Sequence, residues 1–289
     1  MFMISRILLL FNLLSVTILL DSCNFRKDQS DNAVQDEEKL GFWSSLIQKD
    51  SLLWEKEDIL DQEMVNYIYS LNNLDSSQIV NSIQDAIQCL NDSANLYKFW
   101  DKVNHYSYHP NSPVRNDEIS LVLFQELVKI STVKEPYKVR YNHIINLLKK
   151  NRPGYLANDF EIIDKSGNIK SLYSIKSPLL LVMFYDPNCH TCHDIIKSLE
   201  ASKILSNLIN QEKVNVLTVN VLLQEKKQSL IHDMPHSWIS ASDPDQSILN
   251  EELYNILAYP TIYLLDQDKK VILKDVDLKQ TLQYLNSIS

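Results

Sequence analysis

The chain has 289 residues, of which 45% are apolar, so it can form one large or two ordinary domains with buried cores. Its formal net charge of −9 argues against non-specific binding to nucleic acid. Only three glycines occur, so neither Gly-rich phosphate-binding pattern, G-x-G-x-x-G or G-x-x-x-x-G-K, is present anywhere in the sequence.

The N-terminus has the pattern of an export signal. Arg6 precedes "ILLLFNLLSVTILL", whose 14 residues fit the apolar region of a secretory signal and fall short of the ~20 that span a membrane. The following "LLDSC" resembles the lipobox of bacterial lipoproteins, although Asp21 stands where a small or apolar residue is usual. The resemblance implies a signal peptide over residues 1–22 and a lipid on Cys23. An ordinary signal peptide or an uncleaved anchor is the alternative, and all three place the rest of the chain outside the cytoplasm, where disulfides form.

A tether and a helical domain are expected next. Residues 23–39 are polar and acidic without apolar periodicity, which is typical of a flexible linker. Residues 40–150 repeat apolar side chains at helical spacing and predict an all-α domain of unassigned role. No group of carboxylates, histidines or cysteines there has a spacing that indicates chemistry, and Cys89 is expected to be an inert core thiol. Three tryptophans are expected in the core or at a docking surface, namely Trp43, Trp54 and Trp100.

From residue 153 to 289 strand and helix patterns alternate, after Pro153 and Gly154 end the helical pattern. "DFEIID" and "GNIKSL" predict a hairpin, and the continuous apolar run "LLLVMFY" predicts a buried central strand. A helix from Cys192 to about Asn210 follows, and then a second buried strand, "VNVLTVNV". Helices are expected over "QEKKQSLIHDM" and "SILNEELYNIL", with a short strand or loop, "SWISASD", between them. The strand pair "TIYLLD" and "KVILKDV" and a last helix complete an α/β domain with a central mixed sheet and helices on both faces.

The candidate site is "NCHTCH", at the junction between the buried strand and the helix. Cys189 would lie at the helix N-terminus, where the helix dipole and free N–H groups stabilise a thiolate. Cys192 lies one turn later and would reach Cys189 to form a disulfide, and a protonated His190 would favour the thiolate further. Pro260 stands directly before a buried strand, where a cis Tyr259–Pro260 bond is expected.

Other chemistry fits this stretch less well. C-x-x-C-H is also the attachment pattern of a c-type haem, with His193 as axial ligand, but haem needs a helical pocket. Zinc takes about four ligands, and the chain has no second ligand pair at a recognised spacing. A peroxiredoxin would carry Thr or Ser three residues before its reactive Cys, where Asp186 stands. We therefore expect neither a metal nor a cofactor, while a plain disulfide in a non-enzymatic binding domain stays open.

The pair of motifs "FYDPNCHTC" and "YPTIYLLD" resembles the thioredoxin-like superfamily over residues 153–289. Residues 214–235 resemble the extra strand and helix inserted in the TlpA/ResA and peroxiredoxin-type branch of that superfamily. A lipoprotein signal and a helical domain before such a motif are also found together in a group of bacterial envelope proteins. The resemblance implies that Cys189 attacks and Cys192 resolves, and that Pro260 and Tyr259 bind the substrate.

Three positions depart from that family. Asn188 replaces the usual Trp before the first Cys, and His-Thr separates the two cysteines. Met183 stands where many members carry a buried Asp that transfers protons. Asp186 is a nearby substitute that would tune the thiol pKa, although a turn explains this residue equally well.

The expected function is thiol-disulfide exchange with partner proteins in the bacterial cell envelope, on the periplasmic or cell-surface side of a membrane. An unidentified membrane protein would supply or accept the electrons, and nucleic acid is not an expected partner. The residues permit either direction; the family resemblance slightly favours reduction and His190 mildly favours oxidation. The alternative is an envelope interaction lipoprotein without enzymatic activity, in which the thioredoxin-like domain is a scaffold.

Overall fold

The structure is a computed structural model that describes residues 41–90, 93–222 and 234–289. The predicted signal peptide, the lipidation site Cys23, the tether and nearly all of the helix expected over "QEKKQSLIHDM" lie outside the described residues. The chain divides into two compact units between Phe99 and Trp100. No helix of the described part is long and apolar enough to cross a membrane.

The first unit is helical, as predicted, and its core is aromatic. The ring of Trp43 stacks on Trp54 at a centroid distance of 5.5 Å, and Tyr67 and Phe99 meet Trp43 edge-on at 5.3 and 5.6 Å. All four side chains are buried, which confirms both tryptophans as core residues. Cys89 is half-buried and, contrary to the prediction, not part of the core, and this burial raises the pKa of its thiol. The elements are α2 (Phe42–Lys49), η1 (Leu53–Glu55), α3 (Glu57–Ser70), η2 (Leu71–Asn73), α4 (Ser76–Gln88) and α5 (Ser93–Val103). The boundary between the two units falls within α5.

The second unit contains the last helices of the predicted all-α region together with the sheet. Phe124 packs on Tyr141 at a ring distance of 4.9 Å, and Tyr141 packs on the buried Trp100 at 4.7 Å. Asn116 starts the second of these helices because its side chain accepts the N–H groups of Glu118 and Ile119. The elements are η3 (Asn104–Tyr108), α6 (Asp117–Leu127) and α7 (Glu135–Leu148).

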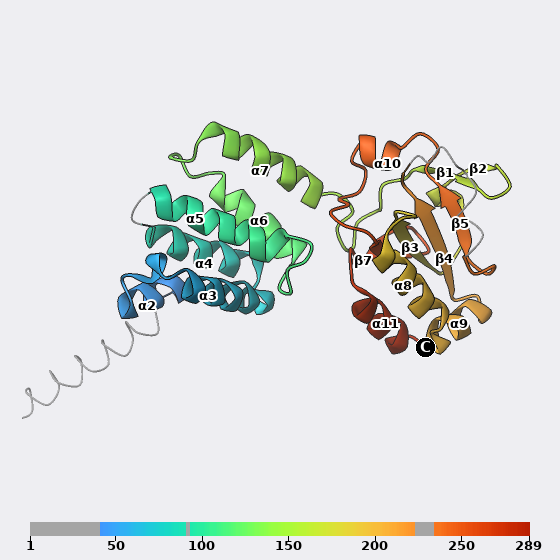
Figure 1. The fold of residues 1–289 in the computed structure, drawn as a ribbon, viewed down its shortest axis with the longest axis horizontal. Coiled ribbons are helices and arrows are strands. Elements are labelled where there is room, and N and C mark those ends of the chain that lie inside the picture. The colour runs from blue at the N-terminus through green and yellow to red at the C-terminus, as the bar shows by residue number, and fades with distance from the viewer. Residues whose placement is uncertain (1–40, 91–92, 223–233) are drawn as a thin grey trace, which may run out of the picture. The chain divides into compact units, whose positions relative to one another are not determined.

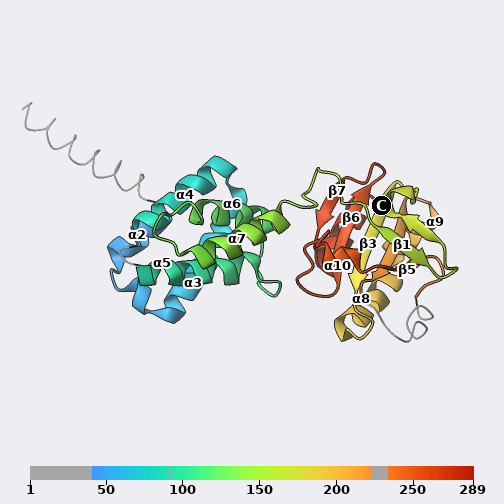
Figure 2. The same ribbon diagram turned by 90° about the horizontal axis from the view of Figure 1, so that it is seen from above.

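The described residues form a sheet of seven strands in the order β2-β1-β5-β4-β3-β6-β7, and Figure 2 shows β7, β6 and β3 following one another. Its centre is the continuous apolar run predicted as a buried strand, which pairs parallel with β4 and antiparallel with β6. The predicted hairpins β1–β2 and β6–β7 are both confirmed. The strands are β1 (Glu161–Asp164), β2 (Ile169–Ser171), β3 (Leu179–Tyr185), β4 (Val214–Asn220), β5 (Ile239–Ser242), β6 (Thr261–Asp266) and β7 (Val271–Lys274).

Two predicted helices differ from the structure. The helix expected from Cys192 to Asn210 is divided, because Ser202 accepts the N–H of Leu205 and begins a new helix. "SILNEELYNIL" is helical only at its start, since Glu252 adopts a left-handed φ of 50° that stops the helix. The observed helices of this part are α8 (His190–Glu200), α9 (Lys203–Asn210), α10 (Ser247–Asn250) and α11 (Leu278–Ser287), with η4 (Leu172–Ser174) after β2.

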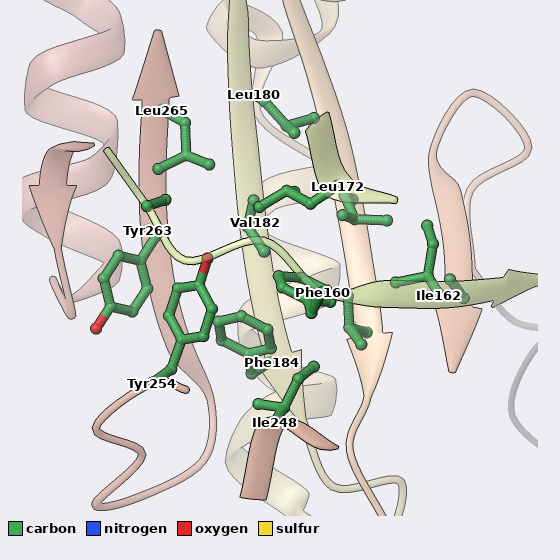
Figure 3. Packing of buried hydrophobic residues seen from close by; sticks show 14 of the residues in the cluster. Phe160, Ile162, Leu172, Leu180, Val182, Phe184, Ile248, Tyr254, Tyr263 and Leu265 are labelled. Carbon is green, nitrogen blue, oxygen red and sulfur yellow. The ribbon is translucent and has the colours of Figure 1, made fainter. Parts of the chain in front are cut away.

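A separate apolar cluster covers each face of the sheet. Met183 lies on the face that packs against α8, α9 and α11 (Figure 1), and Cys192 belongs to the same cluster. Val182 and Phe184 point to the opposite face, because successive residues of a strand alternate. There the ring centroids of Phe184 and Tyr254 are 4.7 Å apart. Figure 3 shows the two rings side by side. The predicted α/β fold with layers on both faces is confirmed.

Candidate active site

The end of the central strand and the start of α8 place Cys189. After β3 a tight turn forms, in which the Asp186 carboxylate accepts the N–H of Asn188 at 2.8 Å and the Asp186 carbonyl accepts that of Cys189 at 3.0 Å. This is the side-chain turn expected of an Asp followed by Pro. Asp186 thus shapes the approach to the helix, which is the second of the two roles considered from the sequence.

The two cysteines have different surroundings. Cys189 is the N-cap of α8 and is partly exposed, and its Sγ accepts the backbone N–H of Cys192 at 3.1 Å. A sulfur in this position faces the positive end of the helix dipole, which stabilises a thiolate. Cys192 is fully buried, and the two side chains form a disulfide with their Cα atoms 5.3 Å apart. An outside thiol or disulfide therefore meets Cys189 and not Cys192.

A loop from a distant part of the chain lies against the sulfur of Cys189. The Tyr259–Pro260 bond is cis, as predicted, and the Tyr259 carbonyl oxygen lies 3.5 Å from the Cys189 Sγ. Thr261 begins β6 directly after this loop and pairs with Phe184 of β3, so sheet register brings the proline beside the dithiol. Burial, and then the nearby Asp186 carboxylate, raise the pKa of the Tyr259 phenol. This side chain is therefore a neutral, half-buried wall of the site.

The histidines of the motif point to different surroundings. His190 is the first residue of α8 and is exposed, so it lies next to Cys189 along the chain and open to solvent. His193 places its Nε2 2.9 Å from the carbonyl oxygen of Pro187. It thus ties the first turn of α8 to the preceding loop, a role that we missed from the sequence, where C-x-x-C-H raised only the question of haem.

Cys192 lies in an apolar cluster with Met183, Ile196 and Leu199. Met183 is fully buried there and is in register with Thr218 on β4, whose hydroxyl is also fully buried. Tyr185 belongs to the same cluster, and burial raises the pKa of its phenol to about 12. The departure at Met183 noted in the sequence therefore leaves an apolar environment behind the dithiol.

The structure brings together four of the predicted site residues, Cys189, Cys192, Tyr259 and Pro260, with Asp186 and His190 beside them along the chain. Within the described ranges no three His, Cys, Asp or Glu side chains gather in a way that would hold a metal ion. The arrangement is an accessible sulfur at a helix start, a buried partner sulfur, and a backbone carbonyl facing them. Chemically, it suits thiol-disulfide exchange.

Two family models match consecutive parts of the chain. A model described as the AhpC/TSA family matches residues 153–274, and a domain of unknown function, DUF5106, matches residues 39–151. No curated protein matches the chain. A solved thioredoxin-like protein from Bacteroides caccae is 28% identical with a TM-score of 0.78, covering 87% of this chain and 90% of that one. The C-terminal domain of an uncharacterized protein from Bacteroides fragilis is 32% identical over 47% of this chain and 98% of that one, with a TM-score of 0.46.

Proposed function

We propose that this chain, which consists of a thioredoxin-like domain of the AhpC/TSA family preceded by a DUF5106 domain, is a thiol-disulfide oxidoreductase acting on partner proteins. The observation that carries the proposal is the asymmetry of the dithiol. Cys189 is partly exposed at the start of α8 and accepts an N–H hydrogen bond, while Cys192 is fully buried. An accessible low-pKa thiol with a buried resolving thiol is what disulfide exchange requires.

The proposed reaction has two steps. The Cys189 thiolate attacks one sulfur of a partner disulfide, a mixed disulfide forms, and the other partner sulfur leaves as a thiolate that takes a proton from water. The Cys192 thiol then loses its proton and attacks the Cys189 sulfur. The second partner sulfur leaves and is protonated, and the Cys189–Cys192 disulfide remains. Two electrons pass from the dithiol to the partner, and a further dithiol protein must return them for another turnover.

The proposed location is the bacterial cell envelope, with Cys23 lipidated and the folded units outside the cytoplasm. The lipobox-like "LLDSC" supports this location, and an oxidising compartment is where such a dithiol meets protein disulfides. We favour reduction of partners, because of the resemblance to the TlpA/ResA branch. The position of Cys189 at a helix start works in the opposite sense, since a stabilised thiolate makes the disulfide a stronger oxidant.

The test is a redox titration of the purified full chain in graded thiol-disulfide buffers, followed by alkylation and mass measurement. The proposal expects Cys189 and Cys192 to titrate together as one two-electron couple. A midpoint near ~−270 mV would make the protein a reductant of partners, and one near ~−120 mV would make it an oxidant. Two cysteines that never cycle as a pair would contradict the proposal and favour the non-enzymatic scaffold, for which the apolar surroundings of Cys192 are the supporting observation.

A further inference from the structure

The loop that faces Cys189 is held in place by residues of the helical region. This loop, residues 251–260, connects α10 to β6 and is here named the cis-Pro segment. It contains no helix or strand, although its first half was expected to be helical. Glu252 lies in the left-handed region at a φ of 50°, which costs a non-glycine residue free energy and persists only where surrounding contacts hold it. The question is which contacts do so.

Two residues that directly follow α7 hold the start of the cis-Pro segment. Lys150 donates from Nζ to the carbonyl oxygens of Glu251 and Glu252 at 3.3 and 2.6 Å. Asn151 donates from Nδ2 to the carbonyl oxygen of Leu253 at 2.8 Å. These three carbonyl groups would be free if the helix of α10 stopped without partners, so side chains of the helical region replace the missing helical bonds.

A third contact reaches the middle of the segment. Tyr108, at the end of η3, donates its hydroxyl to Oδ1 of Asn255 at 3.2 Å, across 147 positions of sequence. Both side chains are buried, and burial raises the pKa of Tyr108 to about 12, so the phenol stays protonated and donates. Phe124 of α6 packs edge-on against the Tyr108 ring, with 5.9 Å between centroids, and fixes its direction. Asn255 lies four residues before Tyr259, whose carbonyl faces the Cys189 sulfur.

The body of the thioredoxin-like domain supplies the remaining support. Tyr254 donates its hydroxyl to the carbonyl oxygen of Asn158 at 2.7 Å, and its ring lies between Phe184 and Tyr263, as Figure 3 shows. Asn158 in turn donates from Nδ2 to the carbonyl of Leu253 at 2.7 Å. The cis-Pro segment is thus fixed from two sides, and one of them belongs to the region matched by DUF5106.

We infer that Tyr108, Lys150 and Asn151 are positioning residues for the dithiol: they hold the cis-Pro segment so that the Tyr259 carbonyl stays against Cys189. The inference rests on the proposed oxidoreductase function and assigns a role to the helical region in it. None of the three residues touches the reacting sulfur atoms. They act through the segment that does.

Two contacts of the Cys189 sulfur act on its pKa in opposite directions. In the reduced protein the Cys189 thiol can donate to the Tyr259 carbonyl, which favours the protonated form, whereas the N–H of Cys192 favours the thiolate. A looser segment removes the first contact and keeps the second, so the pKa of Cys189 falls. The same looseness removes a fixed surface for the partner chain, so KM rises. Asp186, His190 and His193, which lie near Cys189 along the chain, and the Tyr259 phenol are the same residues in all variants.

The experiment compares Tyr108→Phe with the matched control Tyr69→Phe in the full chain. Tyr69 is a tyrosine of α3 that is 69% exposed. The first readout is the pH midpoint of Cys189 alkylation by iodoacetamide, and the second is kcat and KM for reduction of insulin disulfides with dithiothreitol as electron donor. Tyr108→Phe should lower the alkylation midpoint and raise KM by about two- to tenfold, the ratio that corresponds to one neutral hydrogen bond. Tyr69→Phe should match the wild type in both.

The outcomes separate this inference from the proposed function. A wild type that reduces insulin, with Tyr108→Phe equal to it in midpoint and KM, would overturn the inference alone. A wild type that does not reduce insulin, with a lowered midpoint in Tyr108→Phe, would overturn the proposed function and support the positioning. If Tyr108→Phe lost its structure, the alkylation midpoint would move toward ~8.5, the pKa of a free cysteine. In that case Lys150→Met repeats the test at a partly exposed residue.

Discussion

The chemistry of single residues centres on the contrast between Cys189 and Cys192. The first is a partly exposed N-cap that accepts an N–H hydrogen bond, and the second is fully buried among apolar side chains. Attack from outside must therefore begin at Cys189. Cys192 lies in an apolar cluster with Met183, Ile196 and Leu199. In the proposed reaction its proton has to reach solvent from these surroundings.

Serine substitutions separate the two roles. Cys189→Ser should abolish exchange, since no accessible sulfur remains, whereas Cys192→Ser should accumulate a mixed disulfide with the partner. The measurement is mass spectrometry of the chain after incubation with a disulfide-bonded protein. Cys89→Ser is the matched control, because burial raises the pKa of that thiol and it should leave exchange unchanged. Mixed disulfides trapped by Cys189→Ser instead would reverse the assignment.

Met183 tests how apolar the layer behind the dithiol is. Met183→Asp should reduce the free energy of unfolding by ~3 kcal/mol or more, because the carboxylate would be buried without a partner. Met183→Leu, of similar volume, should cost less than ~1.5 kcal/mol. The apolar surroundings would raise the folded-state pKa of the introduced carboxyl. The deficit should therefore grow as pH rises above ~3.9, its value in the unfolded chain, and level off above the folded-state pKa.

Denaturant unfolding of both variants between pH 3 and 7 measures this difference, because that range includes ~3.9, the pKa of Asp in the unfolded chain. Equal stability of Met183→Asp and Met183→Leu across that range would show that the layer admits a charge, which contradicts the apolar environment described above.

At the scale of elements, the helices that follow the dithiol illustrate what local sequence signals decide. A single helix was expected from Cys192 to Asn210, because Ile196, Leu199 and Leu205 continue one apolar pattern. The structure breaks the helix at Ser202, whose side chain accepts the Leu205 N–H at 3.3 Å. Both α8 and α9 still turn their apolar sides to the same cluster, so the pattern is kept across the break.

The break can be tested with a pair of serines. Ser202→Ala removes the N-cap of α9 and should lower the free energy of unfolding by ~1 kcal/mol. Ser198→Ala lies inside α8 at an exposed position, where Ala is the better helix former, and should be neutral or slightly stabilising. Urea unfolding of both variants makes the comparison. Equal effects of the two changes would contradict the capping role of Ser202 and favour the single helix expected from the sequence.

At the scale of the whole molecule, family boundaries and compact units do not coincide. The family models meet between residues 151 and 153, whereas the compact units divide between Phe99 and Trp100. Residues 100–151 therefore pack with the thioredoxin-like domain, and the contacts of Tyr108, Lys150 and Asn151 with the cis-Pro segment belong to one unit. The predicted boundary at about 153 stays a prediction of sequence pattern alone.

The proposed attachment to a membrane depends on one residue, Cys23. Cys23→Ser should move the protein expressed in a bacterial host from the detergent phase to the aqueous phase in a phase-separation assay, because the lipid carries the membrane affinity. Cys89→Ser should stay in the detergent phase. Retention of Cys23→Ser in the detergent phase would support the uncleaved anchor, and an aqueous wild type would support an ordinary cleaved signal peptide.

The sequence by itself determined the all-α and α/β parts, the central buried strand, the terminal hairpins and the position of the dithiol at a helix start. These features depend on local periodicity and on residues close in sequence, such as Cys189 and Cys192. It also marked Pro260, because a proline before an apolar run is a local signal.

Only the tertiary structure decided that the helix after Ser247 stops at Asn250 and that Tyr108 supports the segment facing the dithiol. Both depend on side chains 95 to 147 positions away along the chain, which satisfy carbonyl and amide groups that a local pattern assigns to a helix. Sequence periodicity reports which face of an element is apolar. It does not report which distant donor will replace a helical hydrogen bond. At this site distant donors determined the conformation of the cis-Pro segment.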